Sequence, residues 1–573
     1  MVRNEKKTTG FFLTLCICIM VFLSVYIMTK DVYWNGDEAV TYGMANSYHQ
    51  GWMLSQGRVV AYLEGNVIGD SLLETISGLK SFVIDIAKNK KQASYFTYPR
   101  PSETGWYSQD QVRDWFYITE GEGFNYASVY LNAMGDDANS FLYYMLVHTS
   151  GSLFPEISGT SWAGYLVNLV ASVMTLLLLW KTGKYLGFSY GEKIFTCSLY
   201  AISLDFFELV TLSRAYAVST MMHMLLIMAH VLLMKSVHEE DEKQEKRNLL
   251  FLVIIYVFGY VTHYAILFFS IFLGIAMTIW YIYGKHKHVN RYLITGTMAI
   301  VLGMIADPVS VVGLLMKLGN ASHEGLNIID GIMNSVLHFL FPNRYGAYII
   351  LACGFALAVF LFLRHRKEWK NKKSDKYSLN IECELFIGAA ILVEIICVQT
   401  VTGQDYYKAL YPMIILLGVD LFYHGIKEIV PHRIFDKIGK YVWVFLTACI
   451  CILAYFNVSR MIQNKEAENQ AICRIRTILD DNQTSNAIFL RNHASAYEFF
   501  PELQRYENTL VITDVDDVPV SDKQELLEEH KAITCISTVG EAGTEGVLHE
   551  MEQMGYEGKS LYKMDQIQVL HFE

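Results

Sequence analysis

The chain has 573 residues, of which 53% are hydrophobic and 18% are charged, and its formal net charge is −11. Soluble domains contain roughly 45–50% apolar and about 25% charged residues, so this composition excludes an ordinary soluble protein. The acidic balance argues against nucleic-acid binding, and the sequence contains no basic stripe, no Cys/His ligand spacing and no phosphate-binding glycine loop.

The apolar residues are concentrated in runs bounded by Lys and Arg, with about the 17–22 residues needed to cross a membrane as a helix. Backbone groups inside lipid must be paired internally, so these runs are predicted to be helices. The first run follows Arg3, Lys6 and Lys7 and has no small-residue cleavage site after it, which favours a retained helix over a signal peptide. The long run 249–283 is divided at 259–263. The resulting eleven predicted spans are 11–29, 162–180, 193–212, 215–234, 249–262, 264–283, 292–308, 346–363, 384–402, 408–424 and 441–457.

Positive charge predicts the orientation of these spans. The alternate connections that are rich in Lys and Arg are 181–193, 235–247, 285–291, 364–376 and 427–440. The N-terminal segment is basic as well, whereas the short connections near Arg214, His263 and Gln404 carry almost no positive charge. Because Lys and Arg accumulate in short cytoplasmic loops, we expect a multi-pass cell-membrane protein with a cytoplasmic N-terminus and an extracytoplasmic C-terminus.

Three long segments, 30–160, 309–345 and 458–573, are therefore predicted on the outer side. In the first, helical spacing predicts an amphipathic helix over 71–83 that lies in the membrane interface. The stretch 326–341 has a similar pattern. The apolar positions that define the first of these faces are 72, 76, 79, 82, 83 and 86.

The C-terminal segment is predicted to be a small α/β domain, because short β-rich runs alternate with polar helical stretches such as 521–531. The β-rich runs are 487–490, 509–513, 532–536 and 567–572. The fold class is thus a polytopic α-helical membrane protein, with a transmembrane domain over 1–457 and an extracytoplasmic α/β domain over 458–573. In an exported tail Cys473 and Cys535 could form a disulfide or remain free thiols.

Two acidic pairs lie on the predicted outer side. Asp37 and Glu38 follow the first span directly and are either an exposed loop pair or a site in which a partly desolvated carboxylate acts as a general base. Asp136 and Asp137 precede the second span and are either capping acids of a helix N-terminus or part of the same site.

Three candidate cationic residues border the short outer turns. Arg214 either extends to the membrane surface or binds an anion such as a lipid phosphate. His263 is either a satisfied structural residue or a ligand. Lys408 follows the last short outer turn and is either an ordinary polar cap or a second cation of the site.

Five segments resemble the GT-C membrane glycosyltransferases, in particular family 39, which includes protein O-mannosyltransferases and aminoarabinose transferases. Residues 36–39 resemble the family's Asp-Glu motif, and 137–144 with His148 resemble its second motif, although Asn139-Ser140-Phe141 replaces His-Pro-Pro. Residues 213–217 resemble the family's Arg-x-Tyr-Ala segment, and residues 262–264 resemble its Thr-His-Tyr turn. Residues 406–412 resemble its late Arg-Tyr-x-x-x-x-x-Pro region, with Lys in place of Arg.

The resemblance implies a GT-C-like fold and an inverting glycosyltransferase that moves a sugar from a polyprenyl-phosphate donor to a glycan, lipid or protein acceptor on the outer face. It implies that Asp37 is the general base and that Glu38 and Asp137 position the acceptor or tune that base. The residues implied to bind the substrate or the lipid phosphate are Arg214, His263, Lys408, Tyr216 and Tyr407. No cofactor is required. Binding of a divalent metal by Asp137 and its neighbours is left as an alternative.

Two other classes remain as alternatives. A transporter or lipid flippase would place charges near the membrane midplane and repeat its helices in two related halves. The second alternative is a catalytically inactive scaffold, because the second motif is altered at Asn139-Ser140-Phe141.

Overall fold

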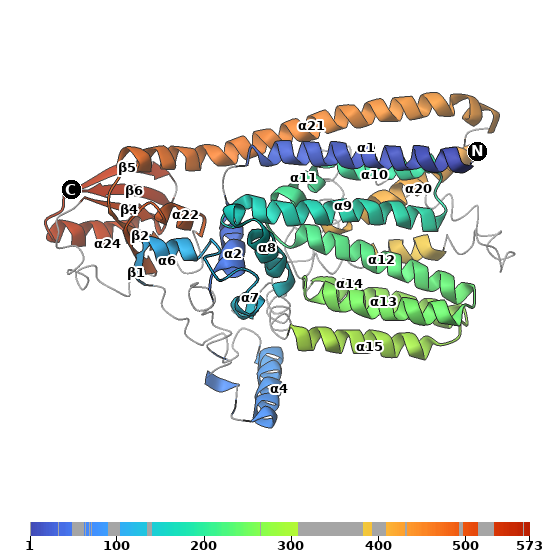
Figure 1. The fold of residues 1–573 in the computed structure, drawn as a ribbon, viewed down its shortest axis with the longest axis horizontal. Coiled ribbons are helices and arrows are strands. Elements are labelled where there is room, and N and C mark those ends of the chain that lie inside the picture. Colours follow the sequence, from blue (N-terminus) through green and yellow to red (C-terminus); the bar gives the residue numbers. More distant parts are fainter. Residues whose placement is uncertain are drawn as a thin grey trace.

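The computed structural model shows a bundle of roughly parallel helices with a sheet domain at one end (Figure 1). It describes residues 2–31, 34–48, 62, 65–67, 69, 71–89, 104–134, 140–263, 265–307, 382–391, 408–429, 432–491, 497–513, 532–564 and 566–573.

Four helices in this described part are long and apolar enough to cross a membrane: α1 (Val2–Met28, apolar from Gly10), α9 (Ser161–Leu186), α12 (Tyr216–His238) and α15 (Val289–Ala306). They coincide with the predicted spans 11–29, 162–180, 215–234 and 292–308. These helices expose large apolar side chains, such as Phe22 on α1 and Ile305 on α15, as expected of helices that face lipid.

The predicted single span 193–212 consists of two helices, α10 (Tyr190–Ala201) and α11 (Leu204–Thr211), with a bend of 54° between them. The break has a local cause. The Ser203 hydroxyl accepts a hydrogen bond from the Phe206 N–H at 3.2 Å and so caps a new helix inside the apolar run.

The division of the run 249–283 is correct, because α13 (Glu242–Tyr260) and α14 (Ala265–Tyr283) are separate helices. The other described parts of the bundle are the helical residues 382–391, α20 (Tyr411–Ile429) and α21 (His432–Asp481). Helix α21 is 50 residues long and crosses the predicted domain boundary at 457. The predicted span 346–363 and most of 384–402 lie outside the described residues.

The two ends of the bundle differ. The N-terminus and the basic connections after α9, α12 and α14 lie at one end, and the described part of 30–160 and the C-terminal sheet domain lie at the other (Figure 1). The first of these segments forms α2 (Gly36–Asn46), α6 (Gln109–Asp114), α7 (Tyr126–Met134) and α8 (Phe141–Leu153).

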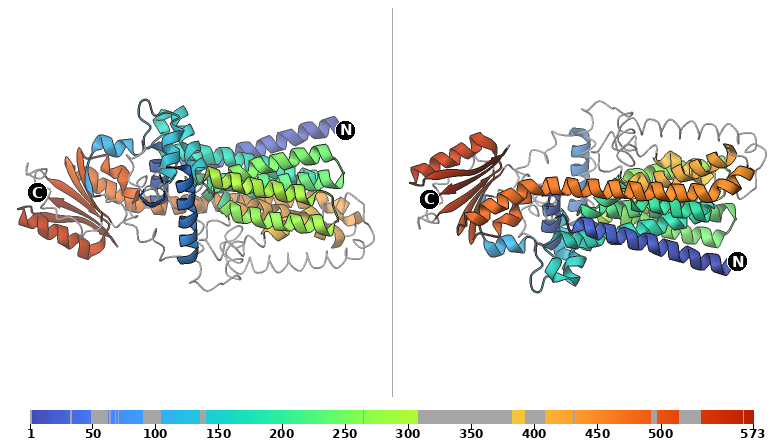
Figure 2. Two further views of the ribbon diagram at one scale, coloured as in Figure 1. Left: turned by 90° about the horizontal axis from the view of Figure 1, so that it is seen from below. Right: turned by 90° about the horizontal axis from the view of Figure 1, so that it is seen from above.

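The predicted amphipathic helix 71–83 is observed as α4 (Leu72–Asn89), which lies across the bundle axis (Figures 1 and 2). It exposes Ile76 of the predicted apolar face, with Leu73 and Ile84 beside that face, whereas Phe82 of the predicted face is buried. Its position in a membrane interface stays a prediction. The similar stretch 326–341 lies outside the described residues.

The C-terminal domain contains a mixed six-stranded sheet with strand order β1-β3-β2-β4-β6-β5. The four predicted strands are β2 (Asn486–Arg491), β3 (Asn508–Thr513), β4 (Ile533–Ser537) and β6 (Ile567–Phe572). β5 (Gly558–Met564) was not predicted, because its Gly, Ser and two Lys residues make this run weakly apolar. The helical stretch 521–531 lies outside the described residues.

The remaining strand, β1 (Gly105–Ser108), comes from the first outer segment and pairs antiparallel with β3. The sheet is therefore built from both outer segments and is not confined to 458–573. For Cys473 and Cys535, where a disulfide and separate thiols were both open, the structure shows no disulfide: Cys473 is exposed on α21, and Cys535 is buried in β4.

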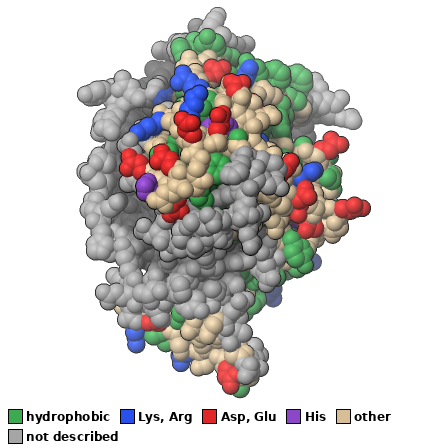
Figure 3. Space-filling model, turned by 90° about the vertical axis from the view of Figure 1, so that its left-hand side faces the viewer, with side chains coloured by type: hydrophobic (Ala, Val, Ile, Leu, Met, Phe, Trp, Pro, Cys, Tyr) green, Lys and Arg blue, Asp and Glu red, His purple; other side chains and the backbone are tan. Residues whose placement is uncertain are grey.

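One apolar cluster joins this domain to the bundle. It includes Tyr42 and Tyr143 of the first outer segment, Leu479 of α21, and Phe489 and Phe500 of the C-terminal domain. The opposite face of the domain carries acidic and basic side chains side by side (Figure 3). The apolar face is thus docked on the outer end of the bundle, and the polar face is directed away from it.

Candidate active site

The Asp-Glu pair lies in the first turn of α2. Asn35 caps this helix by accepting the Glu38 N–H at 2.9 Å, and the Glu38 carboxylate accepts the Asn35 N–H at 3.1 Å. This reciprocal arrangement is a capping box, and acidic residues are favoured in the first turn because the helix dipole is positive there.

Glu38 also connects α2 to the turn between α11 and α12. Its Oε1 accepts the Ser213 N–H at 2.8 Å, and the Tyr42 hydroxyl donates to Ser213 Oγ at 2.7 Å. Burial raises the pKa of Tyr42, so this hydroxyl keeps the proton that it donates. Because Ser213 precedes Arg214, these bonds hold the Arg214 turn against the start of α2.

Asp37 and Arg214, which are 177 residues apart in the chain, are neighbours as a result. Arg214 Nη1 donates to the Asp37 carbonyl oxygen at 3.2 Å, and its Nε lies 3.8 Å from Asp37 Oδ2. The Asp37 side chain is 67% exposed whereas that of Arg214 is 12% exposed. The Asp37 carboxylate is therefore accessible to a substrate, beside a cation that is fixed in place.

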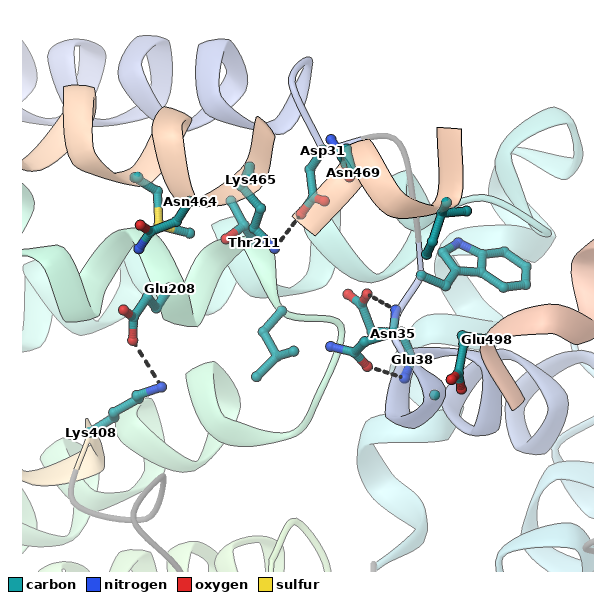
Figure 4. A pocket seen from close by; sticks show the side chains of 15 residues that line it. Asp31, Asn35, Glu38, Glu208, Thr211, Lys408, Asn464, Lys465, Asn469 and Glu498 are labelled. Carbon is teal, nitrogen blue, oxygen red and sulfur yellow. Dashed lines mark hydrogen bonds and ion pairs between the residues drawn. The ribbon is translucent and has the colours of Figure 1, made fainter. Parts of the chain in front are cut away.

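A cavity of about 420 Å³ lies on the other side of this turn and contains two lysines (Figure 4). Lys408 Nζ is 2.9 Å from Glu208, and Lys465 Nζ is 2.8 Å from Asp31. Glu38 also lines the cavity, so its buried carboxylate connects the cavity to the Asp37–Arg214 pair.

Lys465 was not predicted from the sequence. It lies on α21, beyond residue 457, in the part of the chain predicted to form a separate outer domain. The detectable signal was helical spacing: Met461, Lys465 and Asn469 are four residues apart and lie on one face, and all three line the cavity. Asn469 Nδ2 also donates to the Lys30 carbonyl at 2.8 Å, which fixes α21 to the end of α1.

Trp34 and Glu498 are two further lining residues with no predicted role in the site. Trp34 fits the sequence pattern of a membrane-interface anchor, but its ring stacks on Tyr42 with centroids 4.7 Å apart. Glu498 comes from the C-terminal domain and reaches Gly36, where an added Cβ would lie 3.0 Å from its Oε2. No local sequence signal connects Glu498 to residue 36, because the contact depends on docking of the domain.

The Glu38 carboxyl is the most perturbed acid of the site. Burial, and to a smaller extent the nearby Asp31, raise its pKa to about 7, against the lowering effect of Lys465 and of the two backbone N–H donors. A carboxyl in this range exchanges its proton near neutral pH.

This shift predicts a pH dependence of stability. The folded-state pKa of about 7 lies above the ordinary value of 4.5, so the folded protein binds more protons than the unfolded chain between these values. The free energy of unfolding should therefore fall as pH rises from about 4.5 to 7 and level off above about 8, by on the order of 3 kcal/mol from this group. Glu38→Gln, which mimics the protonated acid, should remove this component.

The measurement is denaturation of the purified protein and the Glu38→Gln variant between pH 5 and pH 8. Other titrating groups are common to both proteins, so the difference between the two curves isolates Glu38. Parallel curves would contradict the assignment.

The structure also brings together Tyr216 and His263. Their rings lie with centroids 6.1 Å apart, and His263 is 2% exposed. The turn before His263 adjoins the start of α8, where the Leu142 N–H donates to the Val261 carbonyl at 3.0 Å. The segments that carry the second motif and the Thr-His-Tyr turn are thus neighbours.

Asp137 and Tyr407 lie outside the described residues. His148 is buried on α8 with its ring against Tyr126, and burial lowers its pKa. Among the described residues, no group of three or more His, Cys, Asp or Glu side chains could hold a metal ion.

No protein-family model matches the sequence, and no curated protein sequence matches it significantly. The crystal structure of ArnT from Cupriavidus metallidurans bound to undecaprenyl phosphate superposes with a TM-score of 0.51 at 7% identity, covering 98% of each chain. The apo structure of ArnT gives a TM-score of 0.46 at 8% identity, covering 76% of this chain and 87% of ArnT.

The first of these similarities extends over the whole chain and shows the fold. The protein has the helical fold of ArnT, with apolar membrane-type helices and a C-terminal sheet domain.

Proposed function

We propose that this protein is an inverting glycosyltransferase of the family 39 type, which transfers a sugar from a polyprenyl-phosphate donor to an acceptor on the outer face of a cell membrane. The observation that carries the proposal is the contact between Asp37 and Arg214, an accessible carboxylate 3.8 Å from a fixed guanidinium. A potential base and a phosphate-binding cation are the two groups that this reaction needs.

In the proposed reaction, an acceptor hydroxyl attacks the anomeric carbon while Asp37 takes its proton. The bond between the anomeric carbon and the phosphate oxygen breaks, and the lipid phosphate leaves as a monoester. The negative charge that develops on it is stabilised by Arg214, whose planar group binds phosphate through two parallel N–H bonds. Lys408 and Lys465 lie in the neighbouring cavity, where each is paired with a carboxylate, so either would contact the phosphate only by exchanging that partner.

Glu38 has a positioning role in this proposal. Its two oxygens join Asn35 at the start of α2 to Ser213 beside Arg214, so it sets the separation of base and cation. Asp137, His263, Tyr216 and Tyr407 remain proposed substrate contacts on the strength of the family resemblance.

The proposed membrane arrangement has eleven spans, a cytoplasmic N-terminus and an extracytoplasmic C-terminus. The transmembrane domain covers 1–457 and the outer domain 458–573. This arrangement is supported by the positive-inside distribution of Lys and Arg and by the ArnT-like fold. ArnT was crystallised with undecaprenyl phosphate, which favours a polyprenyl-phosphate donor for this chain as well.

The direct test uses purified protein in lipid nanodiscs with a radiolabelled polyprenyl-phosphate sugar and a mixture of cell-envelope acceptors. Covalent transfer of label that requires the lipid-linked sugar, and that a nucleotide sugar does not support, is the expected result. Movement of the labelled lipid between leaflets without covalent product would instead indicate a flippase. Neither transfer nor movement would indicate an inactive scaffold.

Arg214→Ala should mainly weaken donor binding. A charge-assisted hydrogen bond contributes roughly 1.5–3 kcal/mol, so the KM for the lipid-linked sugar should rise about 10- to 100-fold. Steady-state kinetics at varied donor concentration measure this change. Arg214→Lys is the matched control, because it keeps the charge and should recover part of the affinity. An unchanged donor KM in Arg214→Ala would contradict the phosphate role.

A further inference from the structure

A second cavity, of about 520 Å³, adjoins the first at the outer end of the bundle. The two cavities share Asp31, Trp34 and Glu498 as lining residues. The second cavity is bordered by the end of α1, the start of α9 and α22 (Phe500–Leu503) of the C-terminal domain. A molecule bound there would adjoin the first cavity through the side chains that line both.

Aromatic rings line this second cavity. Trp162, at the start of α9, is 38% exposed, and Tyr117 and Trp34 line the same space. The Tyr117 ring rests directly on Gly159, where an added Cβ would lie only 2.5 Å from the ring. The faces of such rings carry partial negative charge and attract the C–H groups of a sugar ring.

The charged groups of the cavity are largely neutralised by one another. Glu502, whose side chain is 4% exposed, accepts from Arg476 Nε at 2.5 Å with one oxygen and from Arg505 Nε at 2.8 Å with the other. Arg505 also pairs with Asp480. Both guanidinium groups are therefore engaged by carboxylates, and Asp31 is paired with Lys465, so Glu498 adds negative charge to an otherwise balanced lining. An anionic ligand would be repelled, whereas the polar groups suit the hydroxyls of a neutral one.

We propose that the second cavity binds the acceptor, and that the acceptor is a neutral carbohydrate chain. This inference rests on the proposed function. Trp162 and Tyr117 provide the stacking surfaces, and the network of Glu502 with its two arginines supplies hydrogen bonds to hydroxyls. Glu498, which lines both cavities, is a positioning residue that orients the acceptor hydroxyl toward the donor.

The test measures binding of the full-length protein, in detergent, to an array of neutral oligosaccharides. Each is paired with its sulfated or phosphorylated counterpart, and Ser/Thr-rich peptides are included. Neutral oligosaccharides should bind at least tenfold more tightly than their anionic counterparts and the peptides. Trp162→Ala should weaken that binding roughly three- to tenfold through loss of one stacking surface, and Trp162→Tyr should restore most of it.

Trp180→Ala is the matched control. Trp180 lies on the same helix, but at its other end, where Lys193 Nζ is 5.1 Å from its ring, and this variant should bind as the unaltered protein does. Gly159→Ala gives a second, independent variant, because the added methyl forces the Tyr117 ring to move and should reduce binding. Preference for anionic glycans or peptides, no binding to any neutral glycan, or equal binding by Trp162→Ala would each overturn the proposal. The last result would leave Trp162 as a membrane-interface anchor.

A parallel measurement separates this inference from the proposed function. Binding of polyprenyl phosphate to the same preparation and to Arg214→Ala reports on the donor site alone. Neutral glycan binding without any polyprenyl-phosphate binding would refute the transferase and leave the glycan site intact. Sugar transfer only to anionic or peptide acceptors would refute the glycan site and leave the transferase intact.

Discussion

Asp37→Asn is expected to lower sugar transfer by roughly 10²- to 10⁴-fold, the usual contribution of a general base. The amide cannot accept the acceptor's proton, and it also removes the negative charge beside Arg214. The Asp37 side chain is 67% exposed and makes no contact that the fold requires, so the variant should accumulate and fold normally. Initial rates with a radiolabelled polyprenyl-phosphate sugar, at saturating donor, measure the change.

Asp110→Asn is the matched control for this experiment. Asp110 is also an exposed acid in the first turn of a helix of the same outer segment, α6. Like Asp37 it lines neither cavity, but the ion pair with Arg214 is made by Asp37. Its replacement should leave transfer within about twofold of the unaltered protein, as expected for a surface substitution. Full activity in Asp37→Asn would remove Asp37 from the mechanism.

Lys465→Met should be the most destabilising single substitution around the cavity. The Asp31 side chain is 2% exposed and lies 2.8 Å from Lys465 Nζ, and Tyr165 donates to the same Asp31 oxygen at 2.7 Å. Removing the lysine leaves a buried carboxylate without its cation. Breaking a buried ion pair in this way typically costs about 3–5 kcal/mol, so a large decrease in the unfolding midpoint of the purified protein is expected.

Two controls make this result specific. The double variant Asp31→Asn/Lys465→Met removes both charges and should recover much of the lost stability, because no unpaired charge remains buried. Lys246→Met breaks the exposed pair with Glu242 on α13, where both side chains are more than half exposed, and should cost less than about 1 kcal/mol. A midpoint that does not move in Lys465→Met, or a double variant no better than the single one, would show that the ion pair is not a structural element.

The elements that sequence patterns predicted well are those with a strong local cause. Long apolar runs such as 162–180 and 215–234 form helices because lipid leaves the backbone no other partner. The strands at 487–490 and 567–572 were recognisable because β-branched and aromatic residues are concentrated in them. The bend at Ser203 was missed because a single capping residue inside an apolar run does not alter its hydropathy.

The sequence by itself determined the membrane-type helical bundle, the four C-terminal strands and the residue types of the candidate site. It also placed Asp37, Arg214 and Lys408 near the same end of the bundle, because hydropathy and charge are properties of local segments. Only the tertiary structure decided which of these groups meet. Glu38 reaches Ser213 across 175 residues, β1 joins a sheet formed 400 residues later in the chain, and Lys465 and Glu498 enter the site from a helix and a domain beyond residue 457. Such contacts depend on how apolar faces dock. The free energy of docking comes from burial of apolar surface over the whole cluster that joins the C-terminal domain to the bundle. No local pattern specifies it.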